Sequence, residues 1–161
     1  MNIRIYIPHR TNGIETMNRI LAAMAAATLL GGCATSATPL SEARPVPEDR
    51  MRAAPAVASA EPATCVFVRD TGFVGSGSFV DLSIDELPAA LIATGETVRI
   101  TVDPGERLFS ALLHDPFGLN NPVVLAQNVR PGGTYVYRLA TDQNGTVTFI
   151  RSLSERADRL P

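Results

Sequence analysis

Few residues in this chain are of the types that perform catalysis or hold metal ions. Histidine, the most frequent general base and a common metal ligand, occurs twice in 161 residues. His114 stands directly before an Asp-Pro pair, which favours a solvated loop histidine over a catalytic one. The acidic residues Asp81, Asp85 and Glu86 lack the spacing of a metal site and fit a polar strand face that runs into a turn.

Two further patterns could support phosphate binding or nucleophilic chemistry, and neither has the required context. The stretch GFVGSGS, residues 72–78, contains Gly-x-Gly, but a phosphate-binding loop needs a helix after it and a strand pattern follows here. The same stretch does not provide the Gly-x-Ser-x-Gly nucleophile elbow of serine hydrolases. The sequence therefore predicts no catalytic residues, no metal site and no cofactor.

An uncharged apolar run covers residues 20–30 and is followed by small residues. A transmembrane helix needs about 20 apolar residues, so this run is too short to be one. It has the length of the apolar core of a secretory signal peptide, and Arg19 supplies the positive charge that precedes such a core. We expect a signal peptide over residues 1–32. A complete signal already begins at Met17, so we expect translation to start there, with a long charged leader as the alternative.

The end of this signal resembles a bacterial lipoprotein signal. That signal consists of an apolar residue, two small residues and an invariant cysteine, here Leu30, Gly31, Gly32 and Cys33. The resemblance implies cleavage between Gly32 and Cys33 and acylation of the Cys33 thiol with a diacylglyceryl group. Ala34, rather than Asp, follows the cysteine, which favours the outer membrane in the sorting rule of enteric bacteria. We therefore expect a lipid-anchored protein of the bacterial cell envelope, in the outer membrane and facing the periplasm.

The chain has two cysteines, and lipidation of Cys33 would leave Cys65 without a disulfide partner in the chain. Cys65 opens the apolar run CVFV, which predicts a buried free thiol that behaves as a small hydrophobic side chain. An intermolecular disulfide or a reactive thiol is the alternative in an oxidising periplasm.

Residues 33–62 have the composition of a disordered tether. The segment is rich in Pro and Ala, contains no aromatic residue and shows no strand pattern. Such a segment cannot bury enough apolar surface to offset its chain entropy. We expect the lipidated tether to hold the following domain about 30–90 Å from the lipid surface.

Residues 63–153 alternate short β-rich runs with turn signals, and residues 154–161 form a C-terminal tail. The turn Asp103-Pro104-Gly105-Glu106 predicts a positive φ at Gly105 and pairing of the strands on either side, and Asn144-Gly145 predicts a type I′ hairpin. Because no amphipathic helix separates the runs, we expect an all-β fold, a small antiparallel β-sandwich or barrel of seven to eight strands. The clearest predicted strands are 65–69, 79–85, 97–103, 107–114, 123–129, 134–140 and 146–153.

Three motifs in this domain resemble the DUF2846-type small bacterial lipoproteins. That family has a strand ending in an aromatic residue and Arg, a Pro-Gly-Glu turn and a Gly-x-Thr-Tyr-Tyr motif. The matching residues here are Val68-Arg69, Pro104-Gly105-Glu106, and Gly133-Thr134-Tyr135 with Tyr137. The resemblance covers residues 63–153 and implies a β-rich lipoprotein domain without known catalytic activity.

Tyr135 and Tyr137 lie two positions apart, so on a strand they share one face, with Arg138 on the other. A tyrosine pair suits a core edge or a recognition surface. Core packing is the favoured interpretation, and a binding face formed by the two rings is the alternative.

The formal net charge of −2 and the lack of a basic patch argue against nucleic-acid binding. We expect a non-enzymatic interaction or structural module, attached to the membrane through its lipid. Its partner would be an envelope protein or a cell-wall component such as peptidoglycan or another glycan. The alternative is an inhibitor or binder of a cell-wall-degrading enzyme such as lysozyme, although inhibitors of that kind usually rely on a disulfide. An enzyme is a third, less favoured possibility.

Overall fold

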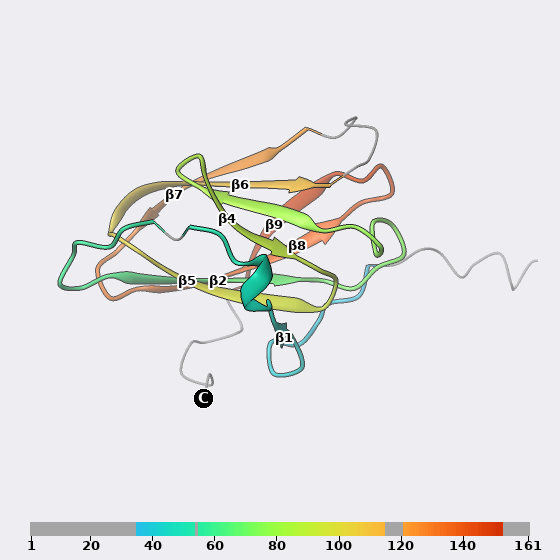
Figure 1. Ribbon diagram of the computed structural model, residues 1–161, viewed down its shortest axis with the longest axis horizontal. Coiled ribbons are helices and arrows are strands. Elements are labelled where there is room, and N and C mark those ends of the chain that lie inside the picture. The colour runs from blue at the N-terminus through green and yellow to red at the C-terminus, as the bar shows by residue number, and fades with distance from the viewer. Residues whose placement is uncertain (1–34, 54, 115–120, 153–161) are drawn as a thin grey trace, which may run out of the picture. The chain divides into compact units, whose positions relative to one another are not determined.

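The described part of the chain folds into two facing β-sheets, as the computed structural model in Figure 1 shows. The structure describes residues 35–53, 55–114 and 121–152, so the predicted signal peptide and the predicted lipidation site Cys33 lie outside the described residues. The strands are β1 (Arg44–Pro45), β2 (Ala63–Arg69), β3 (Val80–Ile84), β4 (Leu87–Ile92), β5 (Glu96–Val102), β6 (Gly105–Leu113), β7 (Val123–Val129), β8 (Thr134–Thr141) and β9 (Val147–Ser152).

The first sheet has the strand order β1-β5-β2-β8-β9, and the second has the order β4-β3-β6-β7. Eight of these strands begin at or after residue 63, so the predicted all-β sandwich of seven to eight strands is confirmed. Most neighbouring strands are antiparallel, whereas β2 pairs in parallel with β8 and β1 in parallel with β5. Within the described ranges, no helix has the length and hydropathy needed to span a membrane.

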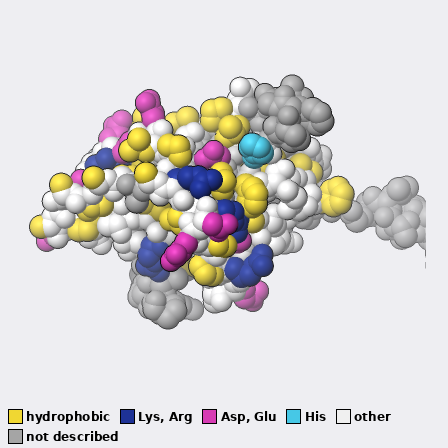
Figure 2. Space-filling view, viewed as in Figure 1, with side chains coloured by type: hydrophobic (Ala, Val, Ile, Leu, Met, Phe, Trp, Pro, Cys, Tyr) yellow, Lys and Arg dark blue, Asp and Glu magenta, His cyan; other side chains and the backbone are white. Residues whose placement is uncertain are grey.

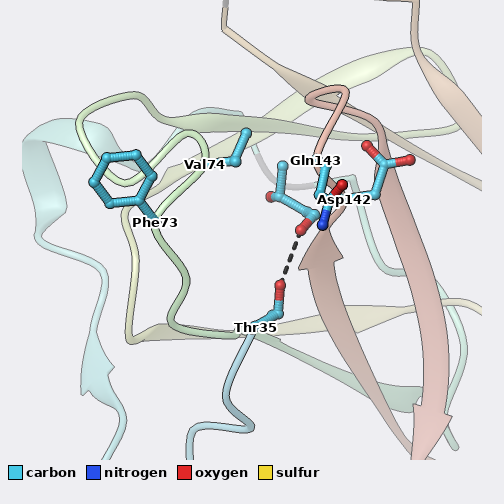
Figure 3. Close-up of a pocket in the computed structure, with 6 residues that line it drawn as sticks. Thr35, Phe73, Val74, Asp142 and Gln143 are labelled. Atoms are coloured by element: carbon cyan, nitrogen blue, oxygen red, sulfur yellow. Dashed lines mark hydrogen bonds between the residues drawn. The ribbon is translucent and has the colours of Figure 1, made fainter. Parts of the chain in front are cut away.

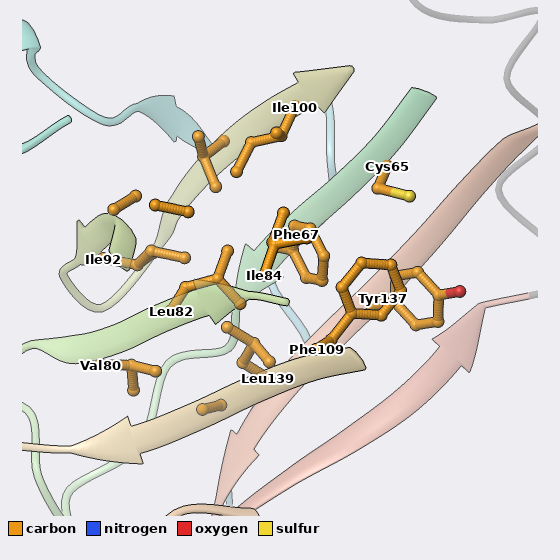
Figure 4. Packing of buried hydrophobic residues seen from close by; sticks show 14 of the residues in the cluster. Cys65, Phe67, Val80, Leu82, Ile84, Ile92, Ile100, Phe109, Tyr137 and Leu139 are labelled. Carbon is orange, nitrogen blue, oxygen red and sulfur yellow. The ribbon is translucent and has the colours of Figure 1, made fainter. Parts of the chain in front are cut away.

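Aromatic side chains fill the centre of the space between the two sheets (Figure 4). Phe67 of β2 stacks on Tyr137 of β8 at 5.3 Å between ring centroids, and Phe109 of β6 meets Phe67 edge-on at 5.2 Å. Offset and edge-on ring pairs of this kind add stability beyond the apolar area that they bury. Strand β2 therefore joins the two sheets through one aromatic cluster.

The tyrosine pair belongs to this core, and the alternative of a binding face at Tyr135 and Tyr137 is wrong. Tyr137 is fully buried and Tyr135 is 7% exposed. Both point inward because β8 is an interior strand of its sheet and its alternate side chains face the second sheet. The Tyr135 hydroxyl accepts a hydrogen bond from the backbone N–H of Arg130 at 2.8 Å, so its polar end stays satisfied.

Cys65 is also buried, as the sequence predicts, and carries a free thiol. Burial raises the pKa of this thiol to about 12, although the charge of Arg107 opposes the shift. The thiolate is the reactive form of cysteine, so burial and the raised pKa both lower the reactivity expected of Cys65.

Two predicted turns differ from the expectation in informative ways. Gly105 has the expected positive φ, +118°, but the strands around it do not pair: β5 lies in the first sheet and β6 in the second. This turn therefore carries the chain from the first sheet to the second.

The predicted β8–β9 hairpin is confirmed, but the prediction of a type I′ turn is wrong, because Gly145 has a positive φ and Asn144 does not. The Asp142 carboxylate instead accepts the backbone N–H groups of Asn144 and Thr146.

Residues 35–53 and 55–62, here called the strap, are ordered along the sandwich, so the prediction of a disordered tether is wrong for this part of the chain. Strand β1 pairs with β5, and Met51 forms an isolated bridge with Ala90 of β4. The strap therefore connects β5 of the first sheet with β4 of the second (Figure 1). Composition predicted disorder because the strap has little apolar surface of its own, whereas the edges of β5 and β4 offer backbone hydrogen-bonding groups to it.

A buried ion pair holds the middle of the strap. The single-turn 3₁₀ helix η1 (Glu48–Arg50) ends in Arg50, whose guanidinium forms two hydrogen bonds, 2.6 and 2.8 Å, with the carboxylate of Glu96 in β5. Glu96 is 5% exposed. Burial alone would raise the pKa of Glu96, but hydrogen bonds from Arg50 and from the Ala93 N–H, together with the nearby arginine charges, lower it below its ordinary value.

The positive φ of Gly105 leads to a first prediction. A Cβ at Gly105 would meet no atom within 4 Å, so the cost of Gly105→Ala is backbone strain alone. We expect the free energy of unfolding to fall by about 1–3 kcal/mol in urea titrations. Gly77 is equally open and lacks a positive φ, so Gly77→Ala should stay within about 0.5 kcal/mol of wild type. Equal stability of the two variants would contradict the assignment.

The Arg50–Glu96 pair predicts a pH dependence. The pKa of Glu96 is lowered by folding, so the carboxylate adds stability above its ordinary pKa of 4.5, and that stability is lost as the pH falls through the folded value. Glu96→Gln should reduce the free energy of unfolding by about 1–3 kcal/mol at pH 7, and the difference should shrink as the pH falls below about 4.5. Urea titrations across this pH range measure it, with exposed Glu106→Gln as the control expected to match wild type. A difference that stays constant with pH would contradict the role of the ion pair.

Candidate functional site

One end of the sandwich gathers segments that are far apart in the sequence. The start of the strap, the 72–78 loop and the β8–β9 turn, residues 142–145, meet there and form what we call the Phe73 end (Figure 3). They enclose a shallow pocket of about 140 Å³ lined by Thr35, Phe73, Val74, Thr141, Asp142 and Gln143.

The start of the strap is fastened to this end by hydrogen bonds. The Thr35 hydroxyl donates to the Thr141 carbonyl oxygen at 3.0 Å. Ser36 and Thr71 exchange two backbone hydrogen bonds, 2.7 and 3.0 Å long, as an isolated antiparallel bridge. The first described residues therefore already belong to the folded domain.

A buried salt bridge fixes the next residues of the strap. The Asp70 carboxylate pairs with Arg138 of β8 and accepts the backbone N–H of Thr38 at 3.1 Å. Arg138 also donates to the Thr38 carbonyl oxygen at 2.9 Å, so the backbone of Thr38 is hydrogen-bonded to both members of the ion pair. Arg138 faces away from Tyr135 and Tyr137, as the alternation of β8 predicts.

The 72–78 loop is shaped by the buried guanidinium of Arg69. This side chain, 1% exposed, donates to the carbonyl oxygens of Gly75, Ser78 and Ile92 at 2.6–2.9 Å. Burial lowers the pKa of Arg69 to about 10, so the group remains charged at neutral pH. The fork of donors ties two points of the loop to β4. The glycine-rich loop is thus held in shape by a buried side chain.

Phe73 projects from this loop and is 80% exposed. Exposed apolar side chains are common singly, but an aromatic ring that stands this far into solvent on a loop fastened by a buried arginine is unusual. The sequence analysis considered this loop only for phosphate binding and nucleophilic chemistry and did not identify Phe73. The available signal was Phe73 itself, because an aromatic residue interrupts an otherwise Gly- and Ser-rich stretch.

Buried arginines hold the segments of the Phe73 end together through hydrogen bonds to backbone carbonyl oxygens. Arg69 holds the glycine-rich loop in shape, while Arg138 and Asp70 both hydrogen-bond to the strap at Thr38. Hydrogen bonds to charged groups are stronger than those between neutral groups, and they are directional. Such contacts hold a small, polar loop region, from which the exposed Phe73 projects.

The residues first considered for chemistry are not brought together. Asp81 lies near one end of β3, whereas Asp85 and Glu86 form the turn that follows the other end of this strand. His114 is exposed at the end of β6, and its backbone N–H donates to the Phe79 carbonyl oxygen. Partial burial raises the pKa of Asp81 despite the charges of Arg52 and His114. In the part of the chain that the structure describes, no group of three His, Cys, Asp or Glu side chains could hold a metal ion.

The size and lining of the pocket are better suited to contact with a partner surface than to catalysis. Pockets that bind small molecules usually measure about 300–1,000 Å³, so the pocket of about 140 Å³ at the Phe73 end is small for such a ligand. Its ionisable residue is Asp142, whose carboxylate already accepts backbone N–H groups in its own turn. The arrangement offers an apolar ring beside uncharged polar groups, which is the composition of an interaction surface.

The comparisons with known proteins add little to this site. No protein-family model matches the chain, and no curated protein is similar to it. Among solved structures, the fold is similar to the NMR structure of a protein from Eubacterium rectale, with 12% sequence identity and a TM-score of 0.40. That match covers 63% of this chain and 98% of the other.

The role of Arg69 can be tested through the loop that it holds. Arg69→Met would remove the guanidinium donor from three backbone carbonyl oxygens, so we expect a loss of about 1–3 kcal/mol in unfolding free energy. We also expect faster hydrogen exchange at the Ser78 N–H, which donates to Gly75 within the loop. Arg99→Met, at an exposed position of β5, is the matched control and should change neither measurement. Unchanged exchange at Ser78 in Arg69→Met would contradict this role.

Proposed function

We propose that this chain is a lipid-anchored lipoprotein of the bacterial cell envelope, with a β-sandwich that acts as a non-enzymatic interaction or structural domain. The observation that carries the proposal is the sequence Leu30-Gly31-Gly32-Cys33 directly after a short apolar run. This pattern supports cleavage before Cys33 and acylation of its thiol. Ala34 supports an outer-membrane location facing the periplasm.

In the described fold, several side chains that could take part in catalysis are buried or engaged in ion pairs, and this supports the non-enzymatic part of the proposal. The thiol of Cys65 and the hydroxyl of Tyr137 are buried in the core, and burial raises the pKa of both. The acidic side chains Glu96 and Asp70 are engaged in ion pairs that hold the strap. These groups are withdrawn from contact with a substrate.

Two outer strands support a role in protein or cell-wall contacts. Strands β7 and β9 end their respective sheets among the described strands. Val124 of β7 is 59% exposed and Ile150 of β9 is 46% exposed. An outer strand with exposed apolar side chains can receive an extended segment of a partner by strand addition. An envelope protein is therefore the favoured partner, with a cell-wall glycan as the second candidate.

The anchor is tested by lipid labelling in a bacterial host. We expect wild type to incorporate a labelled fatty acid and Cys33→Ser to incorporate none and to accumulate as the uncleaved precursor. Cys65→Ser is the matched control because it removes the other cysteine of the chain, which is buried in the domain. It should be labelled as wild type. Equal labelling of Cys33→Ser and wild type would refute the proposed anchor.

A further inference from the structure

We propose that the Phe73 end of the domain rests on the membrane that holds the lipid anchor, with the Phe73 ring in the interfacial layer of the lipid. This inference rests on the proposed acylation of Cys33. It assigns a docking surface, the 72–78 loop with the start of the strap, and one occupant, the lipid leaflet that contains the anchor.

The first argument is the length of chain between the anchor and the domain. Cys33 and Thr35 are two positions apart, a span of about 7 Å when fully extended. Thr35 is hydrogen-bonded to Thr141, and Ser36 is paired with Thr71 at the base of the 72–78 loop. An acylated Cys33 would therefore hold this end of the sandwich at the lipid surface, because the strap that follows is ordered along the domain and adds no slack.

The second argument is the distribution of charge. In the described segments at the Phe73 end, which are residues 35–36, 71–79, 93–95, 114 and 142–145, the ionisable residues are His114 and Asp142. The opposite end, formed by the turns around residues 61, 85, 105 and 130, carries Glu61, Asp85, Glu86, Asp103, Glu106, Arg107 and Arg130.

This contrast sets the orientation of the domain. Bringing charged side chains to a lipid surface costs desolvation energy, and an acidic end is repelled by anionic headgroups. In the view of Figure 2, acidic side chains lie over the left and the middle of the molecule and none is seen at its right-hand end, where Figure 1 places the 72–78 loop. The charge-poor Phe73 end is thus the one suited to face the lipid.

The third argument is the presentation of Phe73. Its ring is 80% exposed although the base of its loop is fastened by Arg69, Ser36 and Thr71. An aromatic ring gains free energy by leaving water for the interfacial region of a bilayer, and aromatic residues concentrate there in membrane proteins. A ring held outward beside the anchor position needs no rearrangement to insert.

The test uses tryptophan fluorescence, because the chain contains no tryptophan. Phe73→Trp places a single fluorophore on the proposed membrane face. Leu87→Trp is the matched control, since Leu87 is 49% exposed beside the Asp85-Glu86 turn at the opposite end. The full-length, processed lipoproteins are reconstituted into vesicles of phosphatidylethanolamine and phosphatidylglycerol with bromine-labelled acyl chains. Mass spectrometry of the Cys33 peptide records acylation in each sample.

We expect the Phe73→Trp variant to lose most of its emission to the brominated chains and to shift its maximum to shorter wavelength. The Leu87→Trp variant should keep the emission that it has in unlabelled vesicles. The vesicles contain no other protein, so quenching in the Phe73→Trp variant identifies lipid as the occupant.

The two ways in which the experiment can fail are distinguishable. If Cys33 is acylated and the Phe73→Trp variant is unquenched, or if both variants are quenched equally, the membrane face is wrong and the anchor stands. If Cys33 is not acylated, the proposed function fails and this inference fails with it.

Discussion

The pairing of Arg50 with Glu96 is the interaction on which the arrangement of this domain depends most. Glu96 sits at the start of β5, almost fully buried, and a carboxylate removed from water requires a partner. The strap supplies that partner, and the same guanidinium also donates to the Leu91 carbonyl oxygen of β4. One side chain thus connects both sheets and the strap. Removing it would leave a buried charge on β5 and release the segment that covers this side of the sandwich.

The strap changes what the N-terminal region does. A disordered tether would separate the domain from its anchor by tens of ångströms and leave its orientation free. Here the strap crosses from the Phe73 end, where Thr35 and Ser36 are fastened, to the opposite end, where the Asp103 carboxylate accepts the N–H groups of Ala58 and Ser59. An anchor at Cys33, two positions before the first fastened residue, would therefore orient the domain as well as retain it.

The sequence by itself determined the features that depend on local periodicity and local backbone sterics. Alternation of apolar residues in β3, β5 and β8 predicted these strands, and the inward position shared by Tyr135 and Tyr137 follows from the two-residue repeat. The positive φ of Gly105 was predicted because Pro104 has a fixed φ that suits a turn and the glycine after it can adopt a positive φ. These statements need no knowledge of the rest of the chain.

Only the tertiary structure decided which strands pair, where the strap lies and which aromatic residue is exposed. The turn at Gly105 crosses between sheets because β5 pairs with β2 and β6 pairs with β3, strands that lie farther away in the sequence. The strap is ordered because Glu96 and Asp70, both outside it, present partners that its own composition does not reveal. Phe73 lies on a loop that Arg69 holds only at Gly75 and Ser78, and its ring is exposed, whereas Phe67 and Phe109 are enclosed between two sheets. Each of these outcomes depends on contacts between distant residues, and their free energy is a property of the assembled fold.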